Sequence, residues 1–201
     1  MLDWLYPPKC ALCGLVGRPV ICPDCRAEFP GPAVIPDLRP EIDAVLALHA
    51  YDLRASQAVR SLKYARETAL ASVMGHELRD ALQRSGWAVD AIIPVPIHYR
   101  RWCLRGFNQS ELLARPLAEV APVLPGLART RYTKPQVRMT AAQRRVNLQG
   151  AFRADPRVAG RRIVLVDDVV TSGGTARACA EALRAAQASW IGLLTYAGEA
   201  I

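Results

Sequence analysis

Two neighbouring acids and the short turn after them are the residues of this chain best suited to chemistry. Asp167 and Asp168 follow the apolar run 163–166, which predicts a strand buried on both faces of a parallel sheet. Ligands of such sheets sit beyond the carboxyl ends of the strands. At a bend there, both carboxylates can reach neighbouring hydroxyls or a cation, and the vicinal hydroxyls of a ribose are natural partners.

The turn that follows is suited to a phosphate. It consists of Thr171, Ser172, Gly173, Gly174 and Thr175. Its glycines let the backbone approach a ligand, and the helical pattern over 176–186 places unpaired, positively polarised N–H groups at the start of a helix. The segment has neither the Gly-Lys-Ser/Thr of a triphosphatase loop nor the glycine spacing of a dinucleotide fold. The alternative is an ordinary acidic loop whose glycines only close a turn.

This succession resembles the phosphoribosyl pyrophosphate (PRPP) motif of type I phosphoribosyltransferases. In that family the acidic pair holds the 2'- and 3'-hydroxyls of the ribose, and the loop holds its 5'-phosphate. The resemblance implies an α/β fold with a mainly parallel sheet and flanking helices. It also implies that Asp167 and Asp168 are the catalytic, ribose-binding acids, that residues 171–175 bind PRPP or a related sugar phosphate, and that Mg²⁺ accompanies this ligand.

Four of the six cysteines form two Cys-x-x-Cys pairs near the amino terminus, Cys10 with Cys13 and Cys22 with Cys25. Each pair turns two thiolates toward one point, and four thiolates make a closed, tetrahedral structural zinc site. A knuckle of this size has too little core to fold alone, so the metal would supply its folding energy. A redox pair or reduced thiols are the alternatives.

Length and composition favour one sizeable domain with a small appendage. The chain has 201 residues, 51% of them hydrophobic, which is enough for one large core. No apolar stretch approaches the roughly 20 residues that cross a bilayer, and the first six residues lack the basic-then-apolar order of a secretory signal. The sequence therefore predicts a cytoplasmic protein without membrane insertion.

The predicted elements divide the chain into three parts. Residues 1–29 hold the zinc-binding knuckle, and residues 30–43 form a linker, because four prolines interrupt any helix or strand there. Residues 44–201 form the phosphoribosyltransferase-like domain. Its patterns predict strands at 44–51, 90–96 and 190–196 and helices at 56–64 and 67–84. Strands that alternate with helices indicate a mainly parallel sheet covered on both faces.

Positive charge is concentrated in residues 91–153, although the whole chain carries a net charge of +8. Aromatic residues lie among these arginines, a composition that can pair phosphates while stacking bases, as in proteins that bind single strands. The same residues could hold a pyrophosphate, or form an ordinary solvated surface. The candidates for binding an anion or nucleic acid are Arg100, Arg101, Arg105, Asn108, Gln109, Arg144, Arg145 and Asn147.

Nearly the whole chain resembles the ComF family, bacterial phosphoribosyltransferase-like proteins associated with natural competence or related DNA handling. Besides the cysteine pairs and the PRPP motif, the matching features are Leu62-Lys63-Tyr64, Val95-Pro96, Arg105-Gly-Phe-Asn-Gln109, Gln136, Arg144-x-x-Asn147 and Gly150-Ala-Phe152. The resemblance implies a PRPP-binding protein that acts in DNA uptake or natural transformation. Single-stranded DNA and competence or recombination proteins are its expected partners.

Two functional hypotheses stay open at this point. One is a PRPP-responsive module that binds single-stranded DNA, and the other is an active phosphoribosyltransferase that transfers phosphoribose from PRPP to an unidentified nitrogen acceptor. Purine-type relatives place an acid where this chain has Thr171, which cannot accept a proton at neutral pH, so a purine acceptor is disfavoured. Lys63 is the candidate for the pyrophosphate side, because it follows a short helix where the first loop of the fold approaches the site. An exposed lysine whose stem lies over Tyr64 is the alternative.

Overall fold

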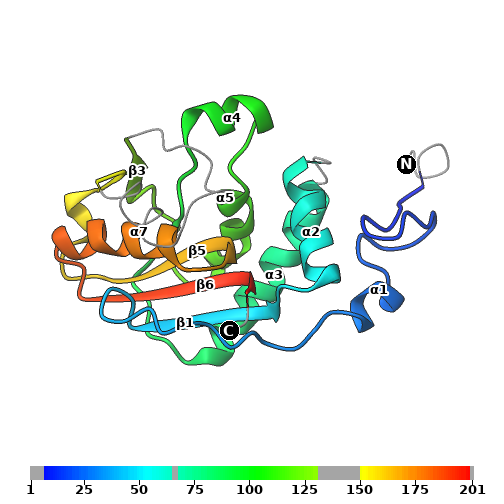
Figure 1. The fold of residues 1–201 in the computed structure, drawn as a ribbon, viewed down its shortest axis with the longest axis horizontal. Coiled ribbons are helices and arrows are strands. Elements are labelled where there is room, and N and C mark those ends of the chain that lie inside the picture. Colours follow the sequence, from blue (N-terminus) through cyan, green and yellow to red (C-terminus); the bar gives the residue numbers. More distant parts are fainter. Residues whose placement is uncertain (1–6, 65–67, 131–149, 200–201) are drawn as a thin grey trace.

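The computed structural model describes residues 7–64, 68–130 and 150–199 (Figure 1). Its elements in chain order are α1 (Pro23–Ala27), β1 (Ala44–Ala50), α2 (Leu53–Tyr64), α3 (Thr68–Ser85), β2 (Ala91–Pro94), α4 (Tyr99–Arg105), α5 (Gln109–Ala114), η1 (Arg115–Glu119), β3 (Leu127–Arg129), β4 (Phe152–Ala154), η3 (Pro156–Val158), β5 (Arg162–Val170), α7 (Gly174–Ala185) and β6 (Trp190–Gly198). Within these described ranges, every helix falls short of the length or the apolarity that crossing a bilayer requires.

Four parallel strands form the central sheet, in the order β1-β6-β5-β2. The inner strands β5 and β6 are covered on both sides, which is why residues 163–166 and 191–197 are continuous buried runs rather than alternating ones. β3 and β4 pair with each other as a separate antiparallel ribbon. The predicted α/β fold with a mainly parallel sheet and flanking helices is confirmed.

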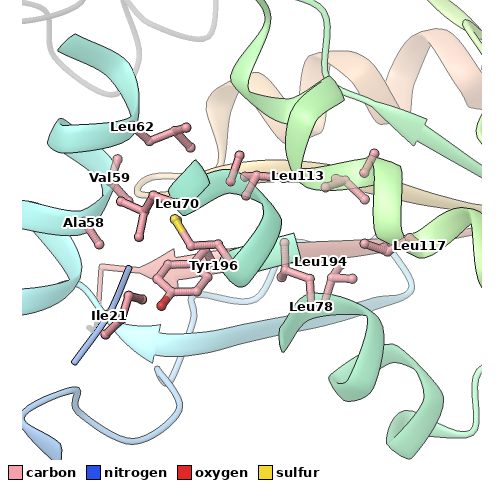
Figure 2. Packing of buried hydrophobic residues seen from close by; sticks show 14 of the residues in the cluster. Ile21, Ala58, Val59, Leu62, Leu70, Leu78, Leu113, Leu117, Leu194 and Tyr196 are labelled. Atoms are coloured by element: carbon pink, nitrogen blue, oxygen red, sulfur yellow. The ribbon is translucent and has the colours of Figure 1, made fainter. Parts of the chain in front are cut away.

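Two hydrophobic cores lie on the two faces of the sheet. On one face, α2, α3 and α5 pack side chains such as Leu62 and Leu113 against Leu194 of β6 (Figure 2). On the other face, α7 packs Leu183 against Leu165 of β5. Because side chains alternate along a strand, consecutive residues of β5 enter different cores, and this decides where the two acids point.

Strand β5 is longer than the sequence pattern predicts. The apolar run 163–166 predicts an end just before the acids, but the strand continues through both of them to Val170. The prediction was wrong at this boundary because β6 also continues, and its residues 195–198 pair with residues 167–170. The acids are therefore held in an extended strand rather than at a bend.

The cysteine-bearing segment packs against α2 rather than standing apart. Leu12 and Ile21 from this segment share a core with Ala58 and Val59 of α2, and Figure 2 shows Ile21 beside this helix. The side-chain amide of Gln57 donates a hydrogen bond to the carbonyl of Leu12 at 2.6 Å. The knuckle thus uses part of the core of the larger domain.

The proline-rich segment 30–43 lies along the outer edge of β1. The amide of Ala50 donates a hydrogen bond to the carbonyl of Gly31 at 2.9 Å. Further along, the side chains of Leu38 and Ile42 are almost completely buried. The segment is therefore packed on the domain over part of its length, while the division of the chain into knuckle, linker and domain stays a prediction.

Candidate functional site

The two acids of β5 point to opposite faces of the sheet. Asp167 lines a cavity beside residues 171–175, on the side of α7. Asp168 lies on the other side, where the ammonium group of Lys63 from α2 reaches it. This is the alternation expected of consecutive residues in an extended strand. The structure therefore brings one carboxylate, rather than both, into the cavity beside the turn.

Asp167 is held by hydrogen bonds from two directions. The hydroxyl of Ser110 on α5 and the backbone amide of Asp168 both donate to its Oδ1, each at 2.9 Å. Burial, and then the negative charge of Asp168, raise the pKa of Asp167, and the charge of Lys63 and the two hydrogen bonds offset only part of this. Asp167 therefore keeps a proton to a higher pH than an ordinary aspartate does, and a ligand that satisfies the ionised carboxylate would lower its pKa.

A cavity of about 40 Å³ separates Asp167 from the turn. Residues 169–176 line it together with Asp167, Leu193 and Thr195. Thr195 lies opposite Asp167 in the ladder, is fully buried, and its Oγ1 has no hydrogen-bond partner among the residues described. Because a buried hydroxyl without a partner is costly, we expect Thr195 to bind a water molecule or a ligand atom in this cavity.

The turn presents the start of α7 to the same cavity. Gly173 is the N-cap of this helix and has φ of +75°, a left-handed conformation that favours glycine. The first amide to make an intrahelical bond is that of Arg177, which donates to the carbonyl of Gly173 at 2.8 Å. The amides before it have no helical acceptor, and the exposed Thr171 and Ser172 add hydroxyl groups. This arrangement suits an anion.

Asp168 already has a cationic partner within the protein. Its Oδ2 lies 2.6 Å from Nζ of Lys63, and the side chains are 5% and 20% exposed, respectively. An ion pair screened by so little water is much stronger than a surface pair. A ligand or cation that binds this oxygen of Asp168 must therefore displace Lys63.

The four cysteines of the amino-terminal segment converge on one point. Their sulfur atoms all lie within 4.8 Å of one another, and those of Cys13 and Cys22 are 3.8 Å apart. Four thiolates at about 2.3 Å from a tetrahedral zinc ion would lie about 3.8 Å from each other. Burial opposes ionisation of Cys10, but hydrogen bonds from the amides of Cys13, Cys22 and Leu12 outweigh it and lower the pKa of that thiol. The cluster could hold a metal such as zinc.

Comparisons with known proteins agree with this geometry. Residues 108–199 match the family profile of the phosphoribosyl transferase domain. The DNA utilization protein YhgH of Escherichia coli O157:H7 is 33% identical over 189 residues, which cover 87% of this chain and 83% of that protein. Competence protein F of Haemophilus influenzae is 39% identical over 103 residues, 47% of this chain and 44% of that one. The chain belongs to the ComF family.

The region that matches the phosphoribosyl transferase domain contains most of the candidate site of this ComF-family chain, and Lys63 lies outside it. It begins at the N-cap of α5 and includes both acids of β5, the turn and Thr195.

Among solved structures, an allosteric regulatory enzyme of purine biosynthesis is similar at a TM-score of 0.43 and 23% identity, over 63% of this chain and 26% of that chain.

The motif Arg105-Gly-Phe-Asn-Gln109 of this ComF-family chain has clear internal contacts. Asn108 caps α5 by accepting a hydrogen bond from the amide of Ser110 at 3.1 Å, and its amide group donates to the carbonyl of Val95 at 3.1 Å. Gln109 accepts a hydrogen bond from Arg105 at 2.8 Å. The motif thus fixes the helix that carries Ser110 to Asp167. A direct role of Asn108 and Gln109 in binding anions or nucleic acid stays a prediction.

Helix α4 carries the other described candidates for anion binding. It has no buried residue and stands out from the body of the domain (Figure 1). Arg100 and Arg101 are exposed on it, as are the aromatic side chains of Tyr99 and Trp102. The remaining candidates, Arg144, Arg145 and Asn147, lie outside the described residues.

Sequence reasoning missed two residues that the fold brings to the site. Ser110 donates a hydrogen bond to Asp167, and Thr195 lines the same cavity as Asp167. A polar residue inside the apolar run 191–197 was the one signal in the sequence that could have revealed Thr195.

Proposed function

We propose that this ComF-family protein binds PRPP or a related sugar phosphate at the carboxyl edge of its sheet and acts in DNA uptake or DNA utilization. The observation that carries the first part is the cavity that Asp167 shares with the start of α7. The names of the relatives, DNA utilization protein and competence protein F, support the second part.

In the proposed binding mode, the two ends of a ribose phosphate meet different groups. The amides at the start of α7 and the hydroxyls of the turn would take the 5'-phosphate, and Asp167 would accept a hydrogen bond from a ribose hydroxyl. Thr195 supports this assignment because its buried hydroxyl faces the same cavity and lacks a partner among the residues described.

Carboxylate oxygens are ligands that Mg²⁺ prefers. Asp167, which lines the cavity, would hold this ion, and Asp168 would become available to it once Lys63 has left. Mg²⁺ would neutralise charge on a bound pyrophosphate when present. The protein itself would supply the ammonium group of Lys63. We propose that this group leaves Asp168 and pairs with the pyrophosphate instead. Its position at the end of α2, one-fifth exposed, permits this movement.

We propose binding rather than turnover as the main role of this site. A transferase that activates a nitrogen acceptor needs a group to take its proton. The position of that acid in purine-type relatives is occupied here by Thr171, an exposed residue of the turn. Transfer of phosphoribose to a nitrogen acceptor remains the alternative.

We further propose that α4 contributes to a surface for single-stranded DNA. Tyr99 and Trp102 are 71% and 49% exposed, whereas aromatic side chains are normally buried in a core. Arg105 at the end of this helix lies with its guanidinium 5.4 Å from the ring centre of Tyr64, which is itself exposed. Aromatic faces beside arginines match the stacking and phosphate contacts of proteins that bind single strands.

Calorimetry tests the sugar-phosphate site. Wild type and the Asp167→Asn/Asp168→Asn double variant would be titrated with Mg-PRPP and with a single-stranded oligonucleotide. We expect the double variant to lose PRPP binding and to keep DNA binding, since α4 is unchanged. Equal PRPP affinity of the two proteins would contradict the proposed site.

Fluorescence anisotropy with a labelled oligothymidylate tests the DNA surface. Trp102→Ala should weaken binding by about 1–3 kcal/mol through lost stacking. Arg100→Gln/Arg101→Gln should weaken it and also flatten the dependence of log affinity on log salt, because fewer counterions are released. Arg157→Gln is the control, since it removes an exposed arginine of η3. Equal affinities for all four proteins would remove α4 from the DNA surface.

A further inference from the structure

The proline-rich segment 30–43 packs against the turn at the start of α7 and is hydrogen-bonded to the first turn of that helix. We infer that Leu38 and Arg177 position this turn and thereby set its affinity for the phosphate of a sugar phosphate. The inference rests on the proposed function for its ligand, but the two contacts that carry it do not depend on any ligand.

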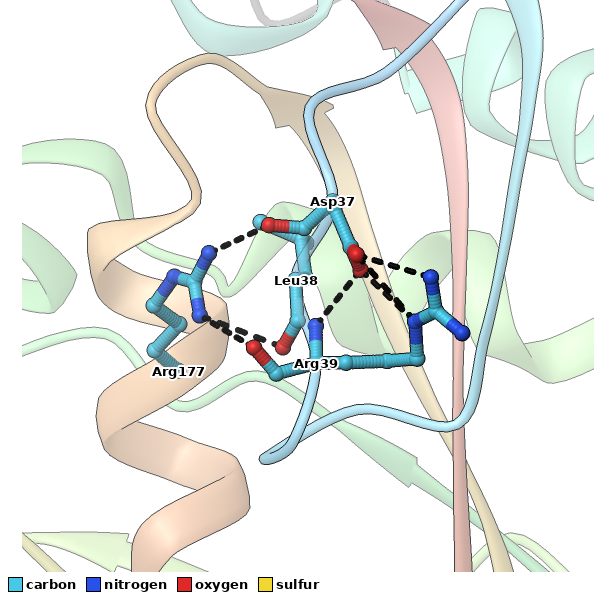
Figure 3. A network of polar contacts seen from close by, with 4 residues as sticks. All are labelled: Asp37, Leu38, Arg39 and Arg177. Carbon is cyan, nitrogen blue, oxygen red and sulfur yellow. Dashed lines mark hydrogen bonds and ion pairs between the residues drawn. The ribbon is translucent and has the colours of Figure 1, made fainter.

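Arg177 joins α7 to the proline-rich segment through four acceptors, and Figure 3 shows the three that are backbone carbonyls. Its Nη1 donates to the carbonyls of Leu38 and Arg39 at 3.2 and 3.5 Å and to the carboxylate of Glu41 at 2.6 Å. Its Nη2 donates to the carbonyl of Asp37 at 2.6 Å. One guanidinium therefore fixes the backbone of three consecutive residues, a use of its planar fork that a lysine cannot reproduce.

Leu38 completes the contact by packing on the turn itself. Its side chain is 2% exposed. A Cβ atom placed on Gly173 would lie 2.4 Å from Cδ2 of Leu38, so the leucine occupies the space beside the glycine where any other residue would carry its side chain. Gly173 is thus required twice, for its positive φ and for this close approach.

The two contacts converge on the amides proposed to bind phosphate. The backbone amide of Arg177 donates to the carbonyl of Gly173 while its side chain holds the carbonyl of Leu38. Gly173 therefore lies between a helical hydrogen bond and a packed leucine. Preorganised donors bind an anion more tightly than donors that must first be ordered, so loosening either contact should weaken phosphate binding.

Arg184 provides a matched control on the same helix. It also joins α7 to the segment before β1, through an ion pair between its Nη2 and Oδ2 of Asp43 at 2.5 Å. It lies seven residues further along α7, about 10 Å along the helix axis, and away from the turn. Replacing Arg184 removes a similar contact between α7 and this segment but leaves the contacts of Gly173 unchanged.

The experiment measures affinity for ribose 5-phosphate by calorimetry, with thermal unfolding of each variant alongside. We expect Leu38→Ala and Arg177→Met to bind about tenfold more weakly than wild type, and Arg184→Met to stay within about twofold. Arg177→Lys should recover only part of the affinity, because an ammonium group donates from one nitrogen, whereas Arg177 reaches its acceptors from both Nη1 and Nη2. Wild-type affinity in folded Leu38→Ala and Arg177→Met would overturn the inference.

Hydrogen exchange separates this inference from the proposed function. If wild type binds no ribose 5-phosphate, the proposed function fails, and the positioning role is then decided on the free proteins. Faster exchange of the amides of residues 173–177 in Leu38→Ala and Arg177→Met than in Arg184→Met would support the inference. Equal exchange in all three variants would refute it.

Discussion

The cysteine knuckle and the carboxyl edge of the sheet both gather groups that can become anions, but they are stabilised differently. In the knuckle, four sulfur atoms converge within 4.8 Å. At the sheet edge, the strand turns Asp167 and Asp168 to opposite faces, and Lys63 lies 2.6 Å from one of them. The sheet edge therefore contains its own cation, whereas the knuckle has the geometry of a site that takes its cation from solution.

This difference predicts what each region needs in order to fold. The larger domain has two hydrophobic cores, which we expect to stabilise it without a metal. The knuckle contributes only a few side chains to one of those cores, so metal binding would supply most of the free energy that orders it. Removing a metal should therefore destabilise the knuckle strongly and the larger domain weakly.

The largest expected effect is therefore on the knuckle. Cys10→Ser/Cys25→Ser removes two of the four thiols, and loss of a structural zinc site forfeits on the order of 10 kcal/mol of metal-binding free energy. We expect the variant to contain no zinc by elemental analysis and to be cleaved rapidly by protease within residues 7–29.

Cys103→Ser is the matched control for this experiment, because Cys103 is an exposed cysteine outside the cluster. It should keep both the metal and the resistance to protease. A wild-type protein without bound metal, with the same melting temperature as the double variant, would show that the two regions do not differ in this way.

The second prediction separates the two acids of the sheet edge. Asp168→Asn leaves Lys63 without its partner, and breaking a largely buried ion pair costs about 3–5 kcal/mol. Because Lys63 is one-fifth exposed and can turn to water, we expect about 2 kcal/mol. Asp167→Asn should change the free energy of unfolding by less than about 1 kcal/mol, since an amide oxygen can still accept from Ser110. Urea unfolding at pH 7 measures both values.

Lys63→Met supplies the control for the pair. If the ion pair is the cause, combining Lys63→Met with Asp168→Asn should destabilise the protein by less than the sum of the single changes. Equal destabilisation by Asp167→Asn and Asp168→Asn would contradict the conclusion that Lys63 pairs with Asp168 and not with Asp167.

The sequence was sufficient for the features that repeat along the chain. Buried apolar runs predicted the parallel strands, and the spacing of four cysteines predicted their convergence, because both depend on local geometry. The order of acids, glycines and hydroxyls at residues 167–175 also predicted a sugar-phosphate site, and this assignment stays a prediction.

What the sequence could not reveal depends on pairing between distant segments. Strand β5 continues through the acids because β6 supplies partners for them, and this continuation sends Asp168 toward Lys63. Likewise, no local pattern connects Leu38 with Gly173, which are far apart in the chain and meet only in the folded protein. Tertiary contacts of this kind override strand and loop propensities.

The last expected effect is a pH dependence that originates at Asp167. Its pKa in the folded protein is raised by burial and by the charge of Asp168. Between the ordinary pKa and the raised one, the folded state keeps a proton that the unfolded state has lost. Folding should therefore become less stable as pH rises through this interval and more stable as pH falls through it.

Urea unfolding of wild type and Asp167→Asn at pH 5 and pH 8 isolates this contribution. We expect the wild type to gain more stability than the variant on going from pH 8 to pH 5, because the asparagine has no proton to take up. Carboxyls remote from Asp167 cancel in this difference, including Asp37 and Asp155, whose pKa values are lowered to about 2 by Arg39 and Arg157, respectively. Parallel pH profiles for the two proteins would mean that Asp167 is ionised as readily as a surface acid. The position of Asp167 away from Lys63 would then have no effect on the free energy of unfolding.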